Sequence, residues 1–227
     1  MSAYGLTQWS SHWPPDLTTL EASMLIDHLI YAAPDLEIAV ADIERRFGVR
    51  PSGGGKHTGQ GTHNKLLSLG PRTYLEIVAP DPEQPEPRSQ RPYGVDGVTA
   101  GGLVGWALAC EDIEATREHA RVEGFDPGEV MEGHRVTRTG TLLRWRSTSN
   151  ALTAGLIPFL ITWGDTPHPA LSAPPGLVLT SLHIEHPDPA SIVGPLRALG
   201  AEVEVRPAAD AALVARLTCP RGSGELR

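Results

Sequence analysis

The chain repeats one pattern three times: an apolar run typical of a buried strand, then an Asp, a helix-like run and a Gly. The apolar runs span 24–33, 103–110 and 177–186, and the Asp and Gly positions are Asp35 and Gly48, Asp112 and Gly124, Asp188 and Gly200. The step from Asp to Asp is 77 residues (35 to 112) and then 76 (112 to 188). A fixed period with the same cap chemistry indicates repeated supersecondary units.

The bulk properties exclude several classes of partner. At 227 residues and 40% hydrophobic content, the chain can bury a sizeable core as one domain or two small lobes. A net charge of -8 argues against nucleic acid, although Lys65 and Arg72 would make the first unit locally positive. Two cysteines are too few for a disulfide framework, and no apolar run reaches the roughly 20 residues of a membrane helix. We therefore expect a cytoplasmic protein with no nucleic-acid or membrane partner.

Composition divides the chain into units and connectors. The predicted parts are an N-terminal arm (1–20), a first βαβββ unit (21–82), a Pro- and Gly-rich connector (83–102), a second βαβββ unit (103–165), a second connector (166–176) and a third, truncated unit (177–227). Within the first unit, Asp35 and Gly48 bound a helix, and the Gly-rich stretch 51–61 is predicted to be a loop. An odd number of units leaves edge strands without a partner, which predicts a homodimer.

These units predict an α+β fold in which βαβββ units form curved mixed sheets with their helices outside. The concave face of such a sheet would hold a ligand. No G-x-S-x-G nucleophile elbow and no phosphate-binding loop of the G-x-x-x-x-G-K-[ST] type is present. Covalent catalysis by a serine is therefore not expected.

Several short motifs resemble one family. They are Asp27-His28 in the first strand, HTGQGTHN at 57–64, YLEIVAPDP at 74–82, LRW at 143–145, IPFLITWG at 157–164, and His168-Pro169. Over residues 24–218 the chain resembles the glyoxalase-like domain branch of the vicinal oxygen chelate (glyoxalase/bleomycin resistance/dioxygenase) superfamily. One fold of this kind hosts unrelated chemistries, so the resemblance predicts the fold more firmly than the reaction.

The resemblance implies a metal site that this chain matches only in its first half. His28 fits the first-strand ligand and Glu76 the last-strand carboxylate for one divalent ion, with zinc, nickel, manganese and iron as the candidates. The second unit has Gly105 and Ile161 where ligands are expected. A third ligand would have to come from one of three other histidines, His57, His63 or His183; otherwise the site is metal-free.

The candidate site combines residues from both units. The predicted catalytic residues are Glu76, His28 and His57, and the predicted substrate-binding residues are Thr62, Asn64, Trp145, Trp163 and His168. Glu76 stands out because a carboxylate in an apolar strand is costly to bury unless it meets a cation, a metal or a proton donor. For His28 and the two tryptophans, ordinary core packing is the alternative interpretation.

Two functions from different classes remain open at this point. The first is a glyoxalase-like enzyme of the lyase or isomerase type, acting on a small polar metabolite with adjacent oxygens, with Glu76 as its base. The alternative is a metal-free protein that binds or sequesters a small molecule, as bleomycin-resistance members do. Glu76 favours the enzyme, whereas Trp106 and Ile161 favour the binding protein. A structural homodimer with a vestigial cup is a third interpretation.

Overall fold

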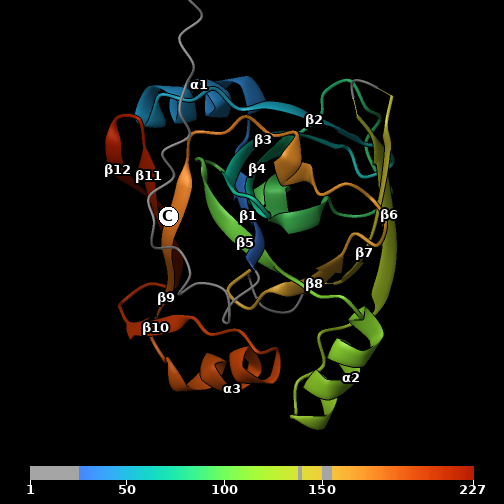
Figure 1. Cartoon of the computed structure of the whole chain (residues 1–227), viewed down its shortest axis with the longest axis vertical. Coiled ribbons are helices and arrows are strands. Elements are labelled where there is room, and N and C mark those ends of the chain that lie inside the picture. The colour runs from blue at the N-terminus through green and yellow to red at the C-terminus, as the bar shows by residue number, and fades with distance from the viewer. Residues whose placement is uncertain (1–25, 138–139, 150–154) are drawn as a thin grey trace, which may run out of the picture.

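The computed structural model describes residues 26–137, 140–149 and 155–227, so the predicted N-terminal arm lies outside the described residues. In chain order the elements are β1 (Ile26–Ala32), α1 (Leu36–Phe47), β2 (Ser52–His57), β3 (Thr62–Gly70), β4 (Thr73–Pro80), the 3₁₀ helix η2 (Pro92–Gly97), β5 (Gly102–Ala109), α2 (Ile113–Val122), β6 (Val130–Val136), β7 (Leu142–Thr148), β8 (Phe159–Thr162), the 3₁₀ helix η3 (Pro169–Leu171), β9 (Val178–His186), α3 (Ala190–Ala198), β10 (Glu204–Pro207), β11 (Ala212–Cys219) and β12 (Gly222–Leu226) (Figure 1).

The first two repeats join into one eight-stranded mixed sheet with the order β2-β3-β4-β1-β5-β8-β7-β6. Each repeat pairs its first strand in parallel with its last, as β1 with β4 and β5 with β8, and the two first strands pair antiparallel at the centre. The sheet curves until its edge strands β2 and β6 contact each other, so it is nearly a barrel (Figure 1). The helices lie outside it. The predicted α+β fold with curved mixed sheets is therefore confirmed.

Two of the three predicted aspartate caps form. The Asp35 side chain accepts a hydrogen bond from the Ile38 amide at 2.8 Å, and Asp112 likewise caps α2 by accepting from the Ala115 amide at 3.0 Å. The expected cap by Asp188 is wrong, because Pro189 occupies the cap position of α3 and no side chain caps that helix. Asp188 therefore lies one residue too early to reach the first free amides of the helix.

The Gly-rich stretch predicted to be a loop is mostly an edge strand. Residues Ser52–His57 form β2, which pairs antiparallel with β3, with a break in register between Ser52 and Gly55. At the break Gly54 has φ +72°, and a Cβ there would collide with the carbonyl of Asn64. Glycine is needed at this point because both the backbone conformation and the close approach of β3 exclude a side chain.

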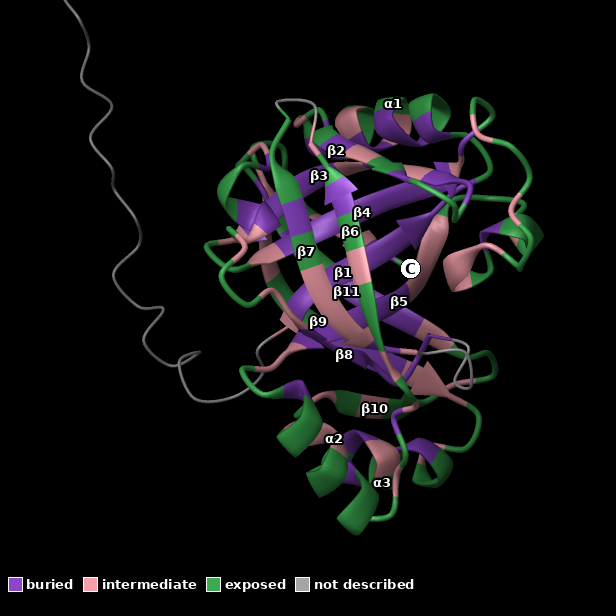
Figure 2. Ribbon diagram, turned by 90° about the vertical axis from the view of Figure 1, so that its right-hand side faces the viewer, coloured by how far each residue is buried: buried purple, intermediate pink, exposed green. Residues whose placement is uncertain are grey.

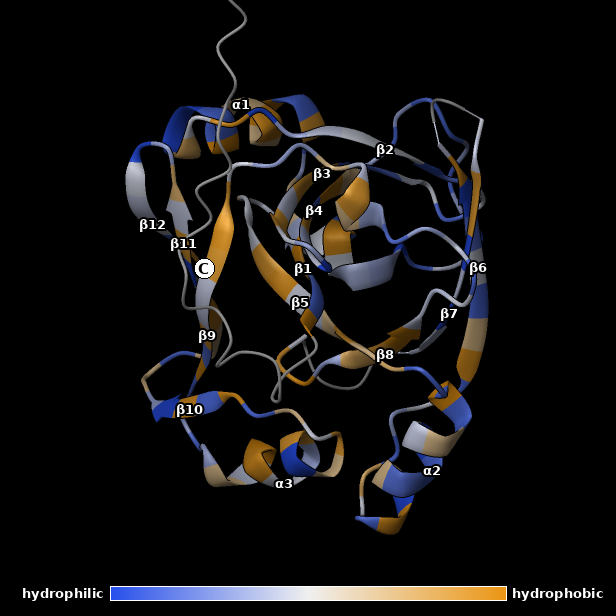
Figure 3. Ribbon diagram, in the orientation of Figure 1, coloured by the Kyte–Doolittle hydropathy of each residue, from blue (hydrophilic) through white to orange (hydrophobic). Residues whose placement is uncertain are grey.

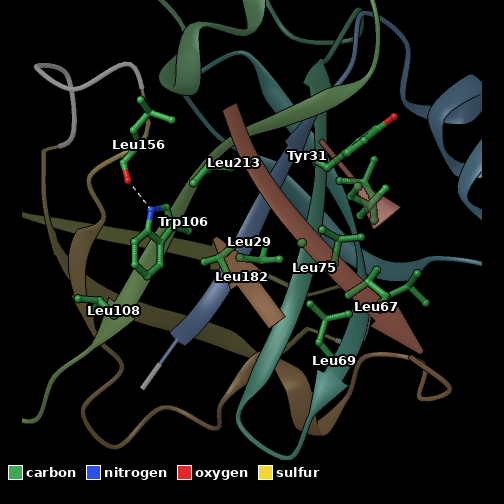
Figure 4. Close-up of a cluster of buried hydrophobic side chains, with 14 of the residues drawn as sticks. Leu29, Tyr31, Leu67, Leu69, Leu75, Trp106, Leu108, Leu156, Leu182 and Leu213 are labelled. Atoms are coloured by element: carbon green, nitrogen blue, oxygen red, sulfur yellow. Dashed lines mark hydrogen bonds between the residues drawn. The ribbon is translucent and has the colours of Figure 1, made fainter. Parts of the chain in front are cut away.

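The third repeat forms its own four-stranded sheet with the order β10-β9-β11-β12. Here β9 pairs in parallel with β10, the strand that follows its helix, which differs from the pairing in the first two repeats. Hydrophobic residues run along β5 and β9 (Figure 3), and the four-stranded sheet packs on the outer face of the large one, with β11 against β5 and β9 against β3. Leu182 and Leu213 join the same buried cluster as Leu29 and Leu75 (Figure 4).

The outer and inner faces of the eight-stranded sheet carry different sets of buried residues. On the outer face Trp106 is fully buried, and its indole N–H donates to the Leu156 carbonyl at 2.8 Å (Figure 4). The inner face has a smaller apolar cluster that includes Ile30, Phe159 and Ile161. The central strands are buried, whereas most of β6 is exposed or half-buried (Figure 2). No helix within the described ranges has the length and apolarity that a membrane span requires.

Candidate functional site

The curved sheet encloses a cavity of ≈ 890 Å³ with residues of both repeats in its wall. Six of the eight candidate residues line it: His28, His57, Asn64, Glu76, Trp145 and Trp163. Thr62 and His168 do not face the cavity but support residues that do. The structure therefore brings the predicted segments together at one cavity, although two of the eight residues lie behind its wall.

Glu76 lies in β4 with a side chain that is almost fully buried. One carboxylate oxygen, Oε1, accepts a hydrogen bond from the Asn64 amide at 2.6 Å. The other, Oε2, lies 3.8 Å from Nε2 of His28. Asn64 cannot turn over, because its own Oδ1 accepts from the Gly55 amide at 2.9 Å. The carboxylate is thus held through one oxygen, while the other lies next to His28.

The same amide fixes the tautomer of His57. Asn64 Nδ2 donates to Nε2 of His57 at 3.2 Å, so the imidazole carries its proton on Nδ1 and donates to Thr62 Oγ1 at 2.9 Å. Burial lowers the pKa of His57, and although Glu76 opposes this effect, Arg135 adds to it. His57 is therefore neutral near pH 7.

Asp27 is the centre of a second network, which orients His28. The carboxylate is fully buried and accepts from His28 Nδ1 at 2.6 Å, Trp163 Nε1 at 3.0 Å and His168 Nε2 at 3.0 Å. Burial alone would raise the pKa of Asp27, but the hydrogen bonds from His168 and His28 outweigh it and lower the pKa to about 2. Asp27 is therefore ionised, and it leaves Nε2 of His28 facing Glu76.

Aromatic side chains complete the wall around these two networks. Tyr74 stacks on the His28 ring at 4.6 Å between centroids, and Tyr93 stacks on Phe159 at 6.2 Å. Burial, followed by the charge of Glu76, raises the pKa of Tyr93, so its hydroxyl is a proton donor. Tyr93 has φ +59°, an uncommon conformation for a bulky residue that indicates a local constraint.

The half of the wall formed by the second repeat is mainly apolar and aromatic. The ring centroids of Trp145 and Trp163 lie 5.6 Å apart, and the angle between the ring planes is 52°. Phe159 and Ile161, on β8 next to the strand of Trp145, also line this half. Trp106, in contrast, belongs to the core on the other face of the sheet. Most of the second-repeat wall therefore supplies shape and apolar surface to the cavity rather than a set of metal ligands.

Comparison with known proteins identifies the family. The family model described as glyoxalase-like domain matches residues 26–200, which is most of the chain. The chain belongs to the glyoxalase-like domain family. The predicted resemblance to glyoxalase-like domains is thereby confirmed. The search of curated proteins gave no significant match.

The search of solved structures gave several matches, of which the first below shows a likeness in fold alone. A hypothetical protein from Staphylococcus aureus matches with a TM-score of 0.60 and 16% identity over 88% of this chain and 84% of that chain. A methylmalonyl-CoA epimerase from Mycobacterium tuberculosis has a TM-score of 0.42 and 18% identity over 66% of this chain and 95% of that one. A variant methylmalonyl-CoA epimerase from Streptomyces coelicolor, in complex with 2-nitronate-propionyl-CoA, has a TM-score of 0.44 and 20% identity over 64% and 98%.

The donor groups of this glyoxalase-like domain do not fit a metal ion. Within residues 26–137, 140–149 and 155–227, no group of three or more His, Cys, Asp or Glu side chains is placed to hold one. His28 and Glu76 provide two donors, while Nε2 of His57 is taken by Asn64. His63 lies beside Asp81 outside the cavity lining, and His183 lies in the four-stranded sheet. A catalytic ion needs about three protein ligands, which is more than these residues provide.

Sequence reasoning missed two residues of this site. Asp27 directly precedes His28 in β1, and the sequence predicts no role for it, because neighbours on a regular strand point to opposite faces. The pairing of β1 with β5 shifts between Ile26 and His28, and this irregularity lets Asp27 bond to His28. Arg135 on β6 also lines the cavity. Neither face of its strand (130–136, VMEGHRV) is apolar in sequence, so only the closure of the sheet reveals that Arg135 lines the cavity.

Proposed function

We propose that the protein is an enzyme of the isomerase or lyase type that moves a proton on a small polar metabolite with adjacent oxygens. The observation that supports this proposal most strongly is the placement of Glu76. Its buried carboxylate lines the cavity, with one oxygen bound by Asn64 and the other 3.8 Å from a histidine that Asp27 orients. A fixed base beside an oriented acid is what proton transfer at a carbon next to a carbonyl requires.

The proposed step uses only residues of this chain. Glu76 takes the proton from the carbon beside the carbonyl, while protonated His28 gives its Nε2 proton to the carbonyl oxygen, and an enediol forms. Glu76 then returns its proton to the neighbouring carbon, and His28 takes the proton of the adjacent hydroxyl. A 2-hydroxy carbonyl compound thus becomes its isomer, and both residues regain their starting states. Asp27 stabilises the imidazolium during the cycle.

Deuterium exchange tests this proposal even while the natural substrate is unidentified. Dihydroxyacetone, hydroxyacetone and 2-hydroxy acids would be incubated in D₂O with the full chain, and loss of the C–H signal would be followed by NMR. We expect exchange by the wild type and a rate at least ~100-fold lower in Glu76→Gln. The matched control is Glu118→Gln, an exposed carboxylate on α2, which should exchange like the wild type. Equal rates in all three proteins would contradict the role of Glu76.

The apolar second half of the wall favours one alternative, a protein that binds a small molecule without turning it over. In that case the two tryptophans of the cavity would form a flat binding surface. Saturable quenching of their fluorescence by the same compounds, with no exchange in any of them, would support this alternative. The homodimer and the cytoplasmic location stay predictions from the sequence, whereas the donor groups of the described residues do not fit the divalent ion that the sequence suggested.

A further inference from the structure

Arg135 occupies a position that folding alone does not explain. It lies on β6, at the edge where β6 meets β2, and only 6% of the residue is exposed. Its side chain is part of the lining of the same cavity as Glu76 and His57. Gly55 on β2 lies beside it, and a Cβ there would be 3.6 Å from the Nη1 atom of Arg135, an ordinary contact distance.

The Arg135 guanidinium has no partner among the described residues. It makes no hydrogen bond or ion pair with any of them, and its Nη1 is buried without an acceptor. Arg117 also has one buried nitrogen without an acceptor, but its Nη2 bonds to Glu129 at 2.7 Å. Arg91, the other arginine in the cavity wall, is paired with Glu86 and Asp96. A buried and unpaired cation is strongly unfavourable, so its retention points to a ligand.

The charges around the cavity specify what kind of ligand that is. Asp27 is ionised, and the Glu76 carboxylate lies in the wall, so the neighbourhood already contains negative charge. His57 is neutral and cannot share the neutralisation of an anion. Arg135 therefore offers one positive charge and a planar fork of donors, which matches a carboxylate in charge and geometry. A phosphate dianion would bring a second negative charge. The His28 imidazolium of the proposed reaction is already paired with Asp27, so no free cation in the described wall offsets that charge.

We propose that Arg135 binds the carboxylate of a small organic acid in this cavity and thereby selects acids as substrates. The proposal rests on the proposed function in one respect, that this cavity is the ligand site. It deepens that function by naming the substrate class: a small acid whose hydroxyl or carbonyl group lies toward Glu76 and His28 while its carboxylate pairs with Arg135.

Binding measurements on the full chain test the role of Arg135 separately from catalysis. The probes are lactate, its neutral amide lactamide, and inorganic phosphate, followed by tryptophan fluorescence and by thermal unfolding. The variants are Arg135→Met, Arg135→Lys and Arg144→Met. Arg144 is exposed and lies on the neighbouring strand β7, so its replacement removes the same charge without touching the cavity.

We expect the wild type and Arg144→Met to bind lactate but neither lactamide nor phosphate. Arg135→Met should bind lactate at least about 30-fold more weakly, and Arg135→Lys should recover only part of the loss because it cannot form the planar fork. Without ligand, Arg135→Met should melt about 2 °C or more above the wild type, since an uncompensated buried charge is removed.

Several results would overturn the proposal. One is lactate binding by Arg135→Met that equals the wild type, and another is equal binding of lactamide or preferred binding of phosphate. An Arg135→Met protein that fails to fold or melts below the wild type would assign the guanidinium to the structure instead. Glu76→Gln separates the two proposals, because it should lose exchange but keep lactate binding. Lactate binding that depends on Arg135, with no exchange by the wild type, would refute the proposed reaction alone.

Discussion

At the scale of single residues, one buried carboxylate sets the geometry of the site. Asp27 accepts hydrogen bonds from His28, Trp163 and His168, which lie in three different parts of the two repeats. The backbone amide of Ala170 donates to Nδ1 of His168, so the proton of that ring is on Nε2 and points at Asp27. The orientation of the His168 ring is thus fixed from its far side. Asp27 thus connects His28, which lies beside Glu76, to Trp163 in the aromatic wall.

Replacing Asp27 with Asn should destabilise the protein and remove part of its acid sensitivity. Because the folded-state pKa of about 2 lies below the ordinary value of 3.8, the ionised carboxylate adds stability that is present above about pH 4 and lost as the pH falls toward 2. That difference and the disturbed hydrogen bonds together should lower the free energy of unfolding by about 2–4 kcal/mol at pH 7. Urea unfolding between pH 7 and pH 2 measures both effects.

The control for this substitution is Asp165→Asn, which removes the same charge from an exposed position. Its unfolding free energy should follow that of the wild type at each pH. If Asp27→Asn also retained the wild-type pH dependence between pH 4 and pH 2, the acid sensitivity attributed to Asp27 would belong to other groups.

The sequence predicts a site residue when the signal lies within its own strand, and fails when the role depends on contacts between distant strands. Glu76 and His28 could be recognised because an ionisable group in an apolar strand is unusual in itself. The role of Arg135 depends on the contact between β2 and β6 where the sheet closes. These two strands are about 80 residues apart in the chain. The local pattern of its strand indicates solvent on both sides. Long-range closure of this kind leaves no periodic signal.

At the scale of elements, the helices were easier to predict than the edge strand. Asp35 and Asp112 cap their helices through contacts of two or three residues, which a short pattern captures. Strand β2 is held instead by hydrogen bonds to β3, and its glycines are typical of loops when read alone. The prediction of a loop failed because the partner strand, and not local propensity, decides the conformation here.

Two neighbouring glycines in β2 allow a matched test of this strand. Both Gly53 and Gly54 have positive φ, at 68° and 72°, but a Cβ meets nothing within 4 Å at Gly53 and collides with Asn64 at Gly54. Gly53→Ala should therefore cost only the backbone term of about 1 kcal/mol. Gly54→Ala should cost at least ~2 kcal/mol more, and it should weaken exchange because Asn64 holds Glu76.

Urea unfolding and the exchange assay on the two variants check this prediction. Similar losses of stability in both would mean that positive φ alone determines the cost and that the contact with Asn64 relaxes freely. Full exchange activity in a folded Gly54→Ala protein would contradict the proposed link from β2 through Asn64 to Glu76.

At the scale of the whole molecule, the four-stranded sheet covers the outer face of the eight-stranded one. The two sheets share one hydrophobic cluster, and the backbone amide of Leu103 donates to the carbonyl of Arg227, at the end of the chain. The cavity is on the opposite face of the large sheet. The third repeat therefore supports the curvature that forms the cavity without contributing a residue to its lining.

This arrangement predicts that a substitution that destabilises the four-stranded sheet also destabilises the eight-stranded sheet. Leu217 on β11 is fully buried in the shared cluster, so Leu217→Ala should cost about 3 kcal/mol and lower the stability of both sheets in one transition. Tryptophan fluorescence reports the large sheet when Trp9 and Trp13 are replaced by Phe, because Trp106 and Trp145 lie on β5 and β7. Far-UV circular dichroism reports both sheets.

The fluorescence and dichroism midpoints in urea should coincide in the wild type and shift together in Leu217→Ala. Leu171→Ala serves as the control, since Leu171 is 73% exposed and the same truncation there should move neither midpoint. If the fluorescence midpoint stayed at its wild-type value while the dichroism signal fell earlier, the third repeat would unfold independently. The large sheet would then keep its curvature unaided, and the apolar face between the sheets would be a contact of two separate folding units rather than one core.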